Sequence, residues 1–403
     1  MLIISDTVEF SGAEEAIVNL AKLLGHQKDV ELRFCSSRFS DSEAPRLPFE
    51  SSLSINRPKP RSVEELYGVL TRPTTLAKTI LHCRAIAESF QPDLVHSGIL
   101  LSILPSIMVA QAMRIPILGH VHDYRLLSLT DLPFIRGFVD APTYAQELNY
   151  YLRTVDAPKA IFGLGLRRSL LSLHNRCNVL IAVSNFVKKS LSRFLRPSME
   201  VLYNVRYNFA QNELNKKKPD RATITYSGRL SAAKGFRVFL EAADLVLKKM
   251  DAEIHITGSG DLAPIAQRFV ANHKESACFH GYMPTRELHD LVARSHLTMH
   301  PSLWPEPCPL SVIKSVCLGT TAFGSRRGGL SELLPPKYLF EPDPSDICHQ
   351  VVKFFDNPKD YPPTLAVDLD ERTVARRIIS IYDHIIRHSS QGTPRFGGLD
   401  ASQ

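Results

Sequence analysis

The chain has 403 residues, of which 44% are hydrophobic and 22% charged, and its formal net charge is +7. It is too long for one ordinary hydrophobic core and suits two domains of a globular soluble protein. Seven scattered cysteines without a C-x-x-C pair argue against a disulfide framework and against a zinc site. The positive charge favours anionic partners such as nucleotide phosphates, nucleic acid or acidic lipid surfaces.

The first half of the chain alternates predicted strands with predicted helices. Apolar runs predict strands at residues 2–4, 30–34, 93–96, 117–121 and 179–183. The segment from Ala13 to Leu24 is apolar on one helical face. The longest apolar stretch, Ile99–Met113, predicts a buried helix, because it is too short to span a bilayer and contains Pro105. We expect a surface loop at residues 46–73 and loose helices at residues 126–173.

The alternation restarts after a polar segment at residues 208–221, which is the predicted linker. Within it, the run Lys216-Lys217-Lys218 is expected to be solvated. Strands are predicted at residues 223–226, 253–257, 278–280, 297–300 and 320–323. A helix is predicted at about residues 234–249, and an apolar stripe indicates a final helix that starts around Glu371.

Strand, helix and strand in repeated order predict parallel sheets that are covered on both faces. The predicted fold class is α/β, with two tandem Rossmann-like doubly wound domains. We assign residues 1–207 to an N-terminal domain, 208–370 to a C-terminal domain, 371–388 to a helix that packs back toward the N-terminal domain, and 389–403 to a disordered tail. Ligands of such sheets bind at the carboxyl ends of the strands, so we expect the site in an interdomain cleft.

One group of basic residues follows a predicted strand and precedes a helix. Its sequence is Ser227-Gly228-Arg229-Leu230-Ser231-Ala232-Ala233-Lys234-Gly235. Gly228 permits a sharp turn, and Arg229 and Lys234 can converge on one anion. A planar guanidinium and a compact ammonium together suit a diphosphate. The alternative is a pair of solvated cations at a helix start, where positive charge is unfavourable.

A second group has the same position between a strand and a helix. Its sequence is Pro301-Ser302-Leu303-Trp304-Pro305-Glu306-Pro307-Cys308-Pro309-Leu310. A carboxylate on a rigid, proline-flanked loop is well placed to accept hydrogen bonds from sugar hydroxyls. The alternative is a turn that carries an exposed Glu306.

These groups belong to an ordered set of motifs. In the second half, the G-R-L-x-x-x-K-G segment and the P-S-x-x-P-E-x-x-P-L-S loop precede Gly328-Gly329-Leu330-Ser331-Glu332. The first half carries, in order, Ser11-Gly12-Ala13-Glu14, His122-Asp123, Val183-Ser184-Asn185-Phe186 and Tyr203-Asn204. Over about residues 1–388 the chain resembles the family 4 retaining glycosyltransferases of group 1, which have the GT-B fold.

The resemblance implies how a nucleotide-sugar donor is bound. Arg229 and Lys234 would bind its diphosphate and stabilise the charge as it leaves. Gly12 would bring backbone N–H groups close to the distal phosphate at a helix start. Backbone amides near Pro309 and Leu310, at another helix start, would assist.

The resemblance also implies which residues contact the reacting sugar. Glu306 would contact the hydroxyls of the transferred sugar, and His122 would lie on the acceptor side. Configuration would be retained, with the leaving diphosphate deprotonating the acceptor on the same face. No cofactor and no divalent metal are expected, because the basic pair neutralises the diphosphate.

One position departs from the family pattern. The family has two glutamates separated by seven residues, and counting from Glu306 places the second at Lys314. The second carboxylate holds the ribose hydroxyls of the nucleotide in the family, whereas an ammonium can only donate. Each lost charged hydrogen bond is worth about 1.5–3 kcal/mol. The outcomes are an altered donor mode with Lys314 in the nucleotide site, compensation by an acidic residue such as Glu332, or a lost activity.

Several other signals are given structural interpretations. Asp368-Leu369-Asp370 matches the D-x-D of metal-dependent transferases, but its place before the final helix favours an N-cap. We expect His120 and His122 on opposite faces of their strand, with one of them in the core and no shared metal. Gly258-Ser259-Gly260 is interpreted as a strand-to-helix turn. The sequence shows no base for Cys308, so a nucleophilic role is not expected for it.

The sequence therefore predicts a retaining hexosyltransferase of polysaccharide biosynthesis that moves a sugar from a nucleotide donor to a glycan, lipid-linked or small-molecule acceptor. The alternatives are a catalytically weak GT-B homologue that acts as a binding or partner subunit, and a nucleotide-sugar epimerase or hydrolase. Nucleic acid is not an expected partner, because the basic runs lack interleaved aromatic residues. Without a secretory signal, we expect a cytoplasmic location with peripheral contact at the inner face of a membrane.

Overall fold

The computed structural model describes residues 1–5, 12–36, 73–128, 143–153, 157–207, 209, 213–214 and 216–389. They form two compact units, each built on a six-stranded parallel sheet. One unit combines the chain up to Val205 with the chain from Leu369, and the other holds Arg206–Asp368. The predicted fold class, two Rossmann-like α/β domains in tandem, is confirmed. Ser11, most of the predicted loop at 46–73 and nearly all of the predicted tail lie outside the described residues.

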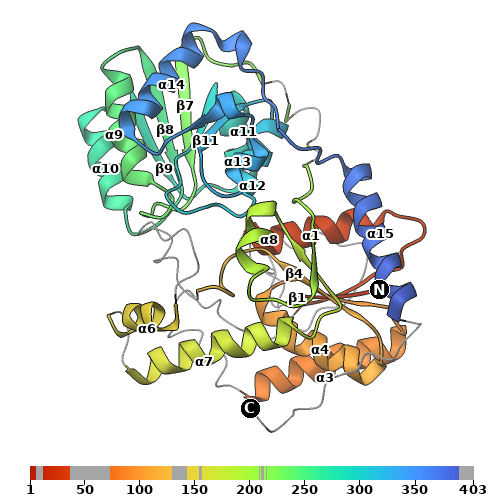
Figure 1. Ribbon diagram of the computed structural model, residues 1–403. Helices are drawn as coiled ribbons and strands as arrows, with labels where there is room; N and C mark the ends of the chain where they lie inside the picture. Colours follow the sequence, from red (N-terminus) through yellow and green to blue (C-terminus); the bar gives the residue numbers. More distant parts are fainter. Residues whose placement is uncertain are drawn as a thin grey trace. The chain divides into compact units, whose positions relative to one another are not determined.

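The first unit contains a sheet with the strand order β2-β1-β3-β4-β5-β6 (Figure 1). Its strands are β1 (Leu2–Ser5), β2 (Arg33–Ser36), β3 (Val95–Ser97), β4 (Ile117–Val121), β5 (Val179–Ala182) and β6 (Ser198–Val201). Its helices are α1 (Gly12–Gly25), α3 (Pro73–Phe90), α4 (Ile103–Met113, after a 3-10 turn at Leu100–Ser102), α6 (Tyr144–Leu152), α7 (Ala157–His174), α8 (Asn185–Leu191) and α15 (Glu371–Ser389). The predicted buried helix within 99–113 is confirmed as α4.

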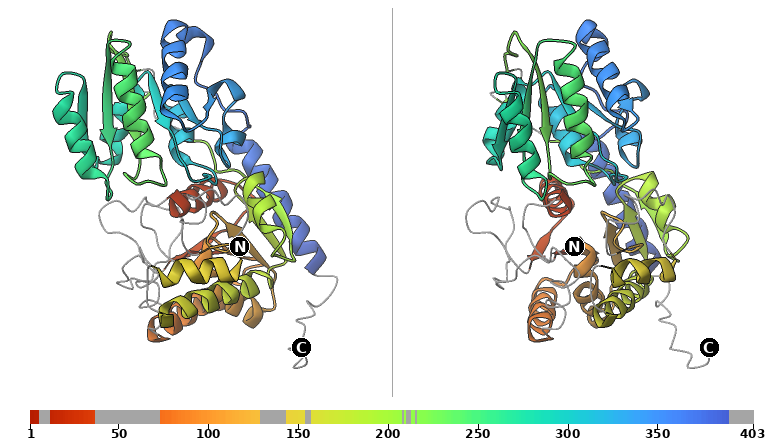
Figure 2. Two further views of the ribbon diagram at one scale, coloured as in Figure 1. Left: turned by 60° about the vertical axis from the view of Figure 1, so that its left-hand side comes forward. Right: turned by 90° about the vertical axis from the view of Figure 1, so that its left-hand side faces the viewer.

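Two layers of helices cover this sheet. On one face, apolar residues of α1 and α15 share a core with residues of β1, β4 and β5. Val374, Ile378 and Ile385 of α15, at helical spacing, are all buried in this core. On the other face, α4 contacts β3, β4, α3 and α7. Figure 2 shows α15 running beside the other elements of the first unit, although about 170 residues of chain separate it from β6.

A row of buried histidines lies beside α15. The rings of His96 on β3 and His120 on β4 stack with their centroids 5.4 Å apart. His96 Nδ1 lies 2.8 Å from the hydroxyl of Tyr382 on α15, so a polar contact joins the final helix to the sheet. Burial lowers the pKa of His96 to about 3, helped by His122, and burial lowers the pKa of His174 at the end of α7 to about 4. These imidazoles are therefore neutral at pH 7.

The second unit contains a sheet with the order β12-β11-β10-β7-β8-β9. Its strands are β7 (Ala222–Ser227), β8 (Ala252–Thr257), β9 (Ala277–Gly281), β10 (Leu297–His300), β11 (Thr321–Ser325) and β12 (Leu339–Phe340). Its helices are α9 (Phe236–Leu247), α10 (Ala263–Asn272), α11 (Thr285–Arg294), α12 (Leu310–Cys317), α13 (Leu330–Leu333) and α14 (Pro344–Asp356), with 3-10 turns at Pro336–Tyr338 and Pro358–Asp360. Helices α9, α10 and α14 pack together on a shared apolar core.

Three sequence predictions need correction. The strand predicted from Val30 begins only at Arg33, because the Val30 amide donates to the carbonyl oxygen of Gln27 in a turn that follows α1. The helix predicted from Lys234 starts at Phe236, because Gly235 before it has a left-handed φ of 64°. The short strands β6 and β12 were not predicted.

The third correction concerns Lys218, which is half-buried and not solvated. Its ammonium donates to the carbonyl oxygens of Ala293 at 2.9 Å and Ser295 at 2.5 Å, and to the hydroxyl of Thr320 at 3.0 Å. Burial lowers the pKa of Lys218 to about 8. This lysine therefore fastens the start of the second unit to the ends of α11 and α12.

Within the described ranges, none of the helices combines the length and the hydrophobicity required to cross a membrane.

The packing of α15 predicts the effect of truncating one side chain. Ile378→Ala removes a fully buried side chain from the core shared with α1, and such changes cost about 2–5 kcal/mol. We expect the unfolding midpoint in urea to fall clearly in this variant. The exposed Arg376→Ala on the same helix serves as control and should unfold close to wild type. Equal midpoints for wild type and Ile378→Ala would contradict the packing.

The buried histidines predict that the folded state loses stability in acid. Their folded pKa values lie below the unfolded value of about 6.5, so the unfolded chain binds more protons between about pH 6.5 and 4. The stability that they contribute is present above pH 6.5 and is lost as the pH falls through this window. We expect the thermal unfolding midpoint, followed by circular dichroism, to drop from pH 7 to pH 5. His174→Gln should make the drop shallower, and a pH-independent midpoint in wild type would contradict the assignment.

Candidate functional site

The candidate site in the second unit is formed by the loops that follow three neighbouring strands. Strands β7, β10 and β11 lie side by side and run parallel, so their carboxyl ends share one edge of the sheet. The loop after β7 carries Arg229 and Lys234, and the loop after β10 carries Glu306. The loop after β11 carries Gly328 and Gly329. The topology therefore brings together the motifs that sequence analysis took from separate segments.

The loops after β7 and β10 approach each other at backbone distance. The amides of Leu303 and Trp304 both donate to the carbonyl oxygen of Ala233 at 3.0 Å. A Cβ atom on Gly235 would lie 1.8 Å from the carbonyl oxygen of Pro301, and the φ of Gly235 is left-handed. Only glycine satisfies both conditions at this position.

Lys234 and Glu306 form an ion pair across these two loops. Lys234 Nζ donates to Glu306 Oε1 at 2.6 Å, and the hydroxyl of Ser302 donates to the same oxygen at 2.5 Å. The Glu306 side chain is 7% exposed and that of Lys234 is 31% exposed. Both bonds use Oε1, and Oε2 has no hydrogen-bond partner in the described part of the chain. Glu306 is thus a buried, paired carboxylate, and the alternative of an exposed glutamate on a turn was wrong.

The loop after β11 fixes the backbone that carries Glu306. The amide of Gly329 donates to the carbonyl oxygen of Glu306 at 2.6 Å. A Cβ atom on Gly329 would lie 2.0 Å from the carbonyl oxygen of Pro307, so the close approach requires glycine. Ser325 Oγ donates to the carbonyl oxygen of Ser302 at 2.7 Å. The Gly328-Gly329 motif therefore supports the position of Glu306.

Arg229 lies on the same edge, and its side chain is exposed. Its carbonyl oxygen accepts a hydrogen bond from Tyr226 at 2.9 Å. Burial raises the pKa of Tyr226, and the charge of Glu306 raises it further while the charge of Arg229 opposes. Both ions thus act on one buried phenol, and Arg229 remains accessible to an anion from solvent.

His300 is a site residue that sequence analysis missed. It ends β10, two residues before Ser302, and its Nδ1 lies 3.3 Å from Ser311 Oγ at the start of α12. Burial lowers the pKa of His300 to about 4, with Glu306 opposing and Lys234 adding to the shift. The signal was available in the sequence, because His300 directly precedes the P-S motif.

The start of α12 lies at the end of the Glu306 loop. Pro309 is the N-cap and Leu310 the first helical residue, and no side chain caps this terminus. One turn later, Lys314 is half-buried, and its Nζ lies 5.1 Å from the centroid of the Tyr207 ring. Glu332, the proposed compensating acid, is half-buried in α13.

The predicted residues of the first unit lie at a separate edge. Gly12 is the first residue of α1, and His122 directly follows β4. A small pocket is lined by Ala13, His122 and Asp123, among others, so the start of α1 and this histidine share a cavity. Burial lowers the pKa of His122 to about 4, opposed by the nearby Asp123 carboxylate. His122 is thus a neutral imidazole at pH 7.

The expectation that His120 and His122 point to opposite faces was wrong. Their rings stack with centroids 4.1 Å apart, because residues two apart on a strand lie on the same face. His120 is buried, as expected for one of the pair, whereas His122 is half-buried.

Two other structural interpretations are confirmed. The Oδ1 atom of Asp370 accepts from the amide of Arg372 at 3.0 Å, so Asp370 caps α15. Gly258 and Gly260 form a turn after β8, where Cβ atoms would lie 1.9 Å from the Gly228 carbonyl oxygen and 2.4 Å from that of Leu230. This turn therefore packs directly against the loop that carries Arg229.

Two family models match most of the chain. The model described as Glycosyltransferase Family 4 matches residues 10–205, and the model described as Glycosyl transferases group 1 matches residues 221–357. An uncharacterized glycosyltransferase of Methanocaldococcus jannaschii is 25% identical over 197 residues, 44% of this chain and 49% of the relative. Glycogen synthase of Thioalkalivibrio sulfidiphilus is 27% identical over 215 residues, 50% of this chain and 43% of the synthase. The chain spans about half the length of these curated relatives.

Solved structures share the fold over nearly the whole chain. Anabaena HepE in complex with UDP and glucose has a TM-score of 0.67 at 16% identity, covering 95% of this chain and 99% of HepE. Sucrose-phosphate synthase of Thermosynechococcus elongatus has a TM-score of 0.70 at 15% identity, covering 96% of this chain and 99% of the synthase. At these identities the likeness establishes the fold, which is GT-B. Together, the two family matches and the fold show that the chain belongs to the group 1 glycosyl transferases of the family 4 type.

Proposed function

We propose that this protein is a glycosyltransferase that takes a sugar from a nucleotide donor bound by the second unit. The observation that carries the proposal is the Lys234–Glu306 ion pair of 2.6 Å beside the exposed Arg229. It provides two cations for a diphosphate and one carboxylate for a sugar at the same edge of one sheet. Membership of the group 1 family supports this assignment.

Arg229 and Lys234 are the proposed diphosphate ligands. The Arg229 guanidinium offers a planar fork to phosphate oxygens, and the Lys234 ammonium offers a compact charge. The uncapped start of α12 at Pro309 and Leu310 adds backbone N–H groups and the positive end of a helix. Gly12 at the start of α1 is the proposed contact for the distal phosphate.

Glu306 is the proposed contact for the transferred sugar. Its Oε1 is already bonded to Lys234 and Ser302, which leaves Oε2 to accept hydrogen bonds from sugar hydroxyls. Holding the carboxylate through two partners fixes its orientation before the donor arrives. Such preorganisation lowers the cost of positioning a reacting group.

A UDP-sugar is the first donor to test. Structures of Anabaena HepE contain UDP, UDP with glucose, and UDP-glucose. These ligands are bound by HepE. On that basis we propose that the donor of this chain carries a hexose.

We propose that the transfer retains configuration. The bond between the anomeric carbon and the diphosphate oxygen breaks, and a bond from the acceptor oxygen forms on the same face. The acceptor proton passes to the departing phosphate oxygen, and Arg229 and Lys234 stabilise the charge that develops there. These cations perform the neutralisation, so the proposed step uses no divalent metal.

The acceptor is proposed to lie near His122 in the first unit. The low pKa of His122 keeps its imidazole neutral, so it can exchange hydrogen bonds with sugar or acceptor hydroxyls without adding charge. A glycan, lipid-linked or small-molecule acceptor fits this role. A lipid-linked acceptor would bring this positively charged chain to an acidic membrane surface.

The proposal is tested by calorimetric titration of the folded protein with UDP-, GDP-, ADP- and TDP-sugars in the absence of metal. We expect selective binding of one donor at roughly micromolar affinity, which lies in the usual range of KM values. Absence of binding to every donor by a folded sample would overturn the proposal in favour of a partner subunit.

Arg229→Ala is expected to abolish most of the turnover. The side chain is exposed, so the variant should fold like wild type, while the loss of one charge-stabilising contact should lower kcat about a hundredfold or more. The exposed Arg237→Ala on α9 is the matched control and should retain activity. Wild-type rates in both Arg229→Ala and Lys234→Ala would remove the diphosphate assignment.

Lys314→Glu tests the position that departs from the family pattern. In an active site that uses Lys314, reversing its charge should weaken binding of the anionic donor by about tenfold or more, since each factor of ten is 1.4 kcal/mol. The uncharged Lys314→Met should lose less affinity, and calorimetry compares the two variants. A gain of affinity in Lys314→Glu would instead indicate a site that has lost its second carboxylate.

A further inference from the structure

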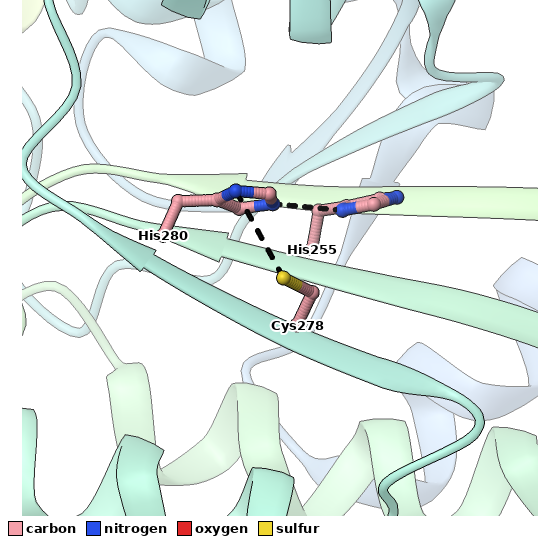
Figure 3. A group of neighbouring side chains, drawn as sticks. All are labelled: His255, Cys278 and His280. Carbon is pink, nitrogen blue, oxygen red and sulfur yellow. Dashed lines mark hydrogen bonds between the residues drawn. The ribbon is translucent and has the colours of Figure 1, made fainter.

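A group of potential metal ligands lies on the second sheet, on strands that carry none of the proposed donor ligands. His255 on β8 and Cys278 and His280 on β9 offer ligand atoms that all lie within 4.8 Å of one another. His255 Nδ1 is 2.9 Å from His280 Nε2, and Cys278 Sγ is 3.9 Å from His280 Nδ1. Figure 3 shows the three side chains standing together on one face of the two strands.

The fold explains why these three residues meet. On β8, Ile254 and Ile256 point into the apolar core, so His255 between them projects from the opposite face. Strand β9 pairs with β8 in parallel, and its register places Cys278 directly beside His255. The register then shifts between Ile256 and Thr257, which is an irregularity of the kind that re-aims a side chain. His280 lies in this irregular part of β9.

A nearby carboxylate orients one of the ligands. Glu253 lies two residues before His255 on the same face, and its Oε1 is 3.5 Å from His255 Nε2. With Nε2 facing the carboxylate, Nδ1 is the nitrogen that faces His280. A carboxylate behind the distal nitrogen of a histidine is the usual outer partner of a metal-bound imidazole, where it fixes both tautomer and ring orientation.

We propose that His255, Cys278 and His280 bind a zinc-class divalent cation, with Glu253 as the outer partner of His255. Two imidazole nitrogens and one thiolate suit Zn²⁺, which bonds nitrogen at about 2.0–2.1 Å and sulfur at about 2.3 Å. In a tetrahedron these bonds space ligand atoms roughly 3.3–3.6 Å apart. His280 can bind one cation through only one of its two nitrogens, and with one ligand atom from each residue the three atoms lie within 4.8 Å of one another. Side-chain rotations therefore have to bring them to the tetrahedral spacing. The fourth position is open to water.

The electrostatics of the two histidines agree with this role, whereas the thiol has to lose a proton that its surroundings favour. Burial lowers the pKa of both His255 and His280, so both imidazoles are neutral and available as ligands at pH 7. Burial and the Glu253 carboxylate raise the pKa of the Cys278 thiol. Cation binding has to displace that proton, so the affinity rises with pH.

The cation would have a structural role. It would join the edge strand β9 to β8 just before the two strands end, where the amide of Gly258 donates to the carbonyl oxygen of Gly281 at 2.7 Å. Gly258 in turn packs against Gly228 in the loop that carries Arg229. The site is separate from the proposed transfer step, which uses no metal.

The test is a Co²⁺ titration of the full, chelator-treated chain, followed by absorption spectroscopy. We expect one Co²⁺ per chain, with the visible bands of tetrahedral cobalt and a thiolate charge-transfer band, both displaced by Zn²⁺. Cys278→Ser should abolish the thiolate band, and Glu253→Gln should weaken the affinity about 10–100-fold. The readout is binding, so it does not depend on transferase activity.

Two control variants exclude other sources of the signal. Cys83→Ser alters a pair of thiols in the first unit, in which the sulfurs of Cys35 and Cys83 lie 2.9 Å apart, and should leave the band unchanged. His349→Ala removes an exposed histidine of the same unit and should bind like wild type. Zn²⁺ should also raise the thermal midpoint of wild type but not that of Cys278→Ser. Absence of binding, or an unchanged band in folded Cys278→Ser, would overturn the proposal.

Discussion

The carboxylate of Glu306 is buried where little water reaches it, and three loops supply the groups that contact it or hold its backbone. Removing a carboxylate from water costs several kcal/mol unless a partner and further hydrogen bonds compensate. Lys234 supplies the opposite charge from the loop after β7, and Ser302 supplies a hydroxyl from its own loop. Gly329 holds the Glu306 carbonyl from the loop after β11. The same contacts that make the burial tolerable also fix the group in one orientation.

The close packing of these loops depends on missing side chains. Gly235, Gly258 and Gly329 each bring the backbone so near to a carbonyl oxygen of another loop that a Cβ atom would lie 1.8 to 2.0 Å from it. These glycines are therefore required because any side chain would clash with the neighbouring backbone. Polar side chains can then converge on a small volume at the edge of the sheet.

Much of the fold could be predicted from the sequence, because buried parallel strands are apolar runs and their helices show one apolar face. The strand at 117–121 was predicted to the residue. Strand β6 was missed because Ser198–Val201 has one exposed and one half-buried position, and β12 because it has only two residues. The ordered motifs predicted which loops carry charge, but the Lys234–Glu306 pair depends on strand order, which spacing does not encode.

The residues that sequence analysis missed have one thing in common: their neighbours in space come from other strands or loops. His300 looked like the end of a strand, and only the fold shows that Glu306 and Lys234 lie close enough to influence its pKa. His255, Cys278 and His280 come from two strands, and their meeting depends on register and on the irregularity in β9. A search for C-x-x-C pairs could not find them. The error about His120 and His122 was to place them on opposite faces of the strand, whereas residues two apart on a strand share a face.

The final helix has a consequence for how the chain is made. The core of the first unit includes Val374, Ile378 and Ile385 from α15, while the second unit is complete by Asp368. During synthesis from the N-terminus, the second unit can therefore finish folding while the first still exposes the apolar face of α1. The ribosome has to release α15, which follows the whole second unit, before that face is covered. The first unit, whose synthesis begins before that of the second, is therefore the last to complete its core.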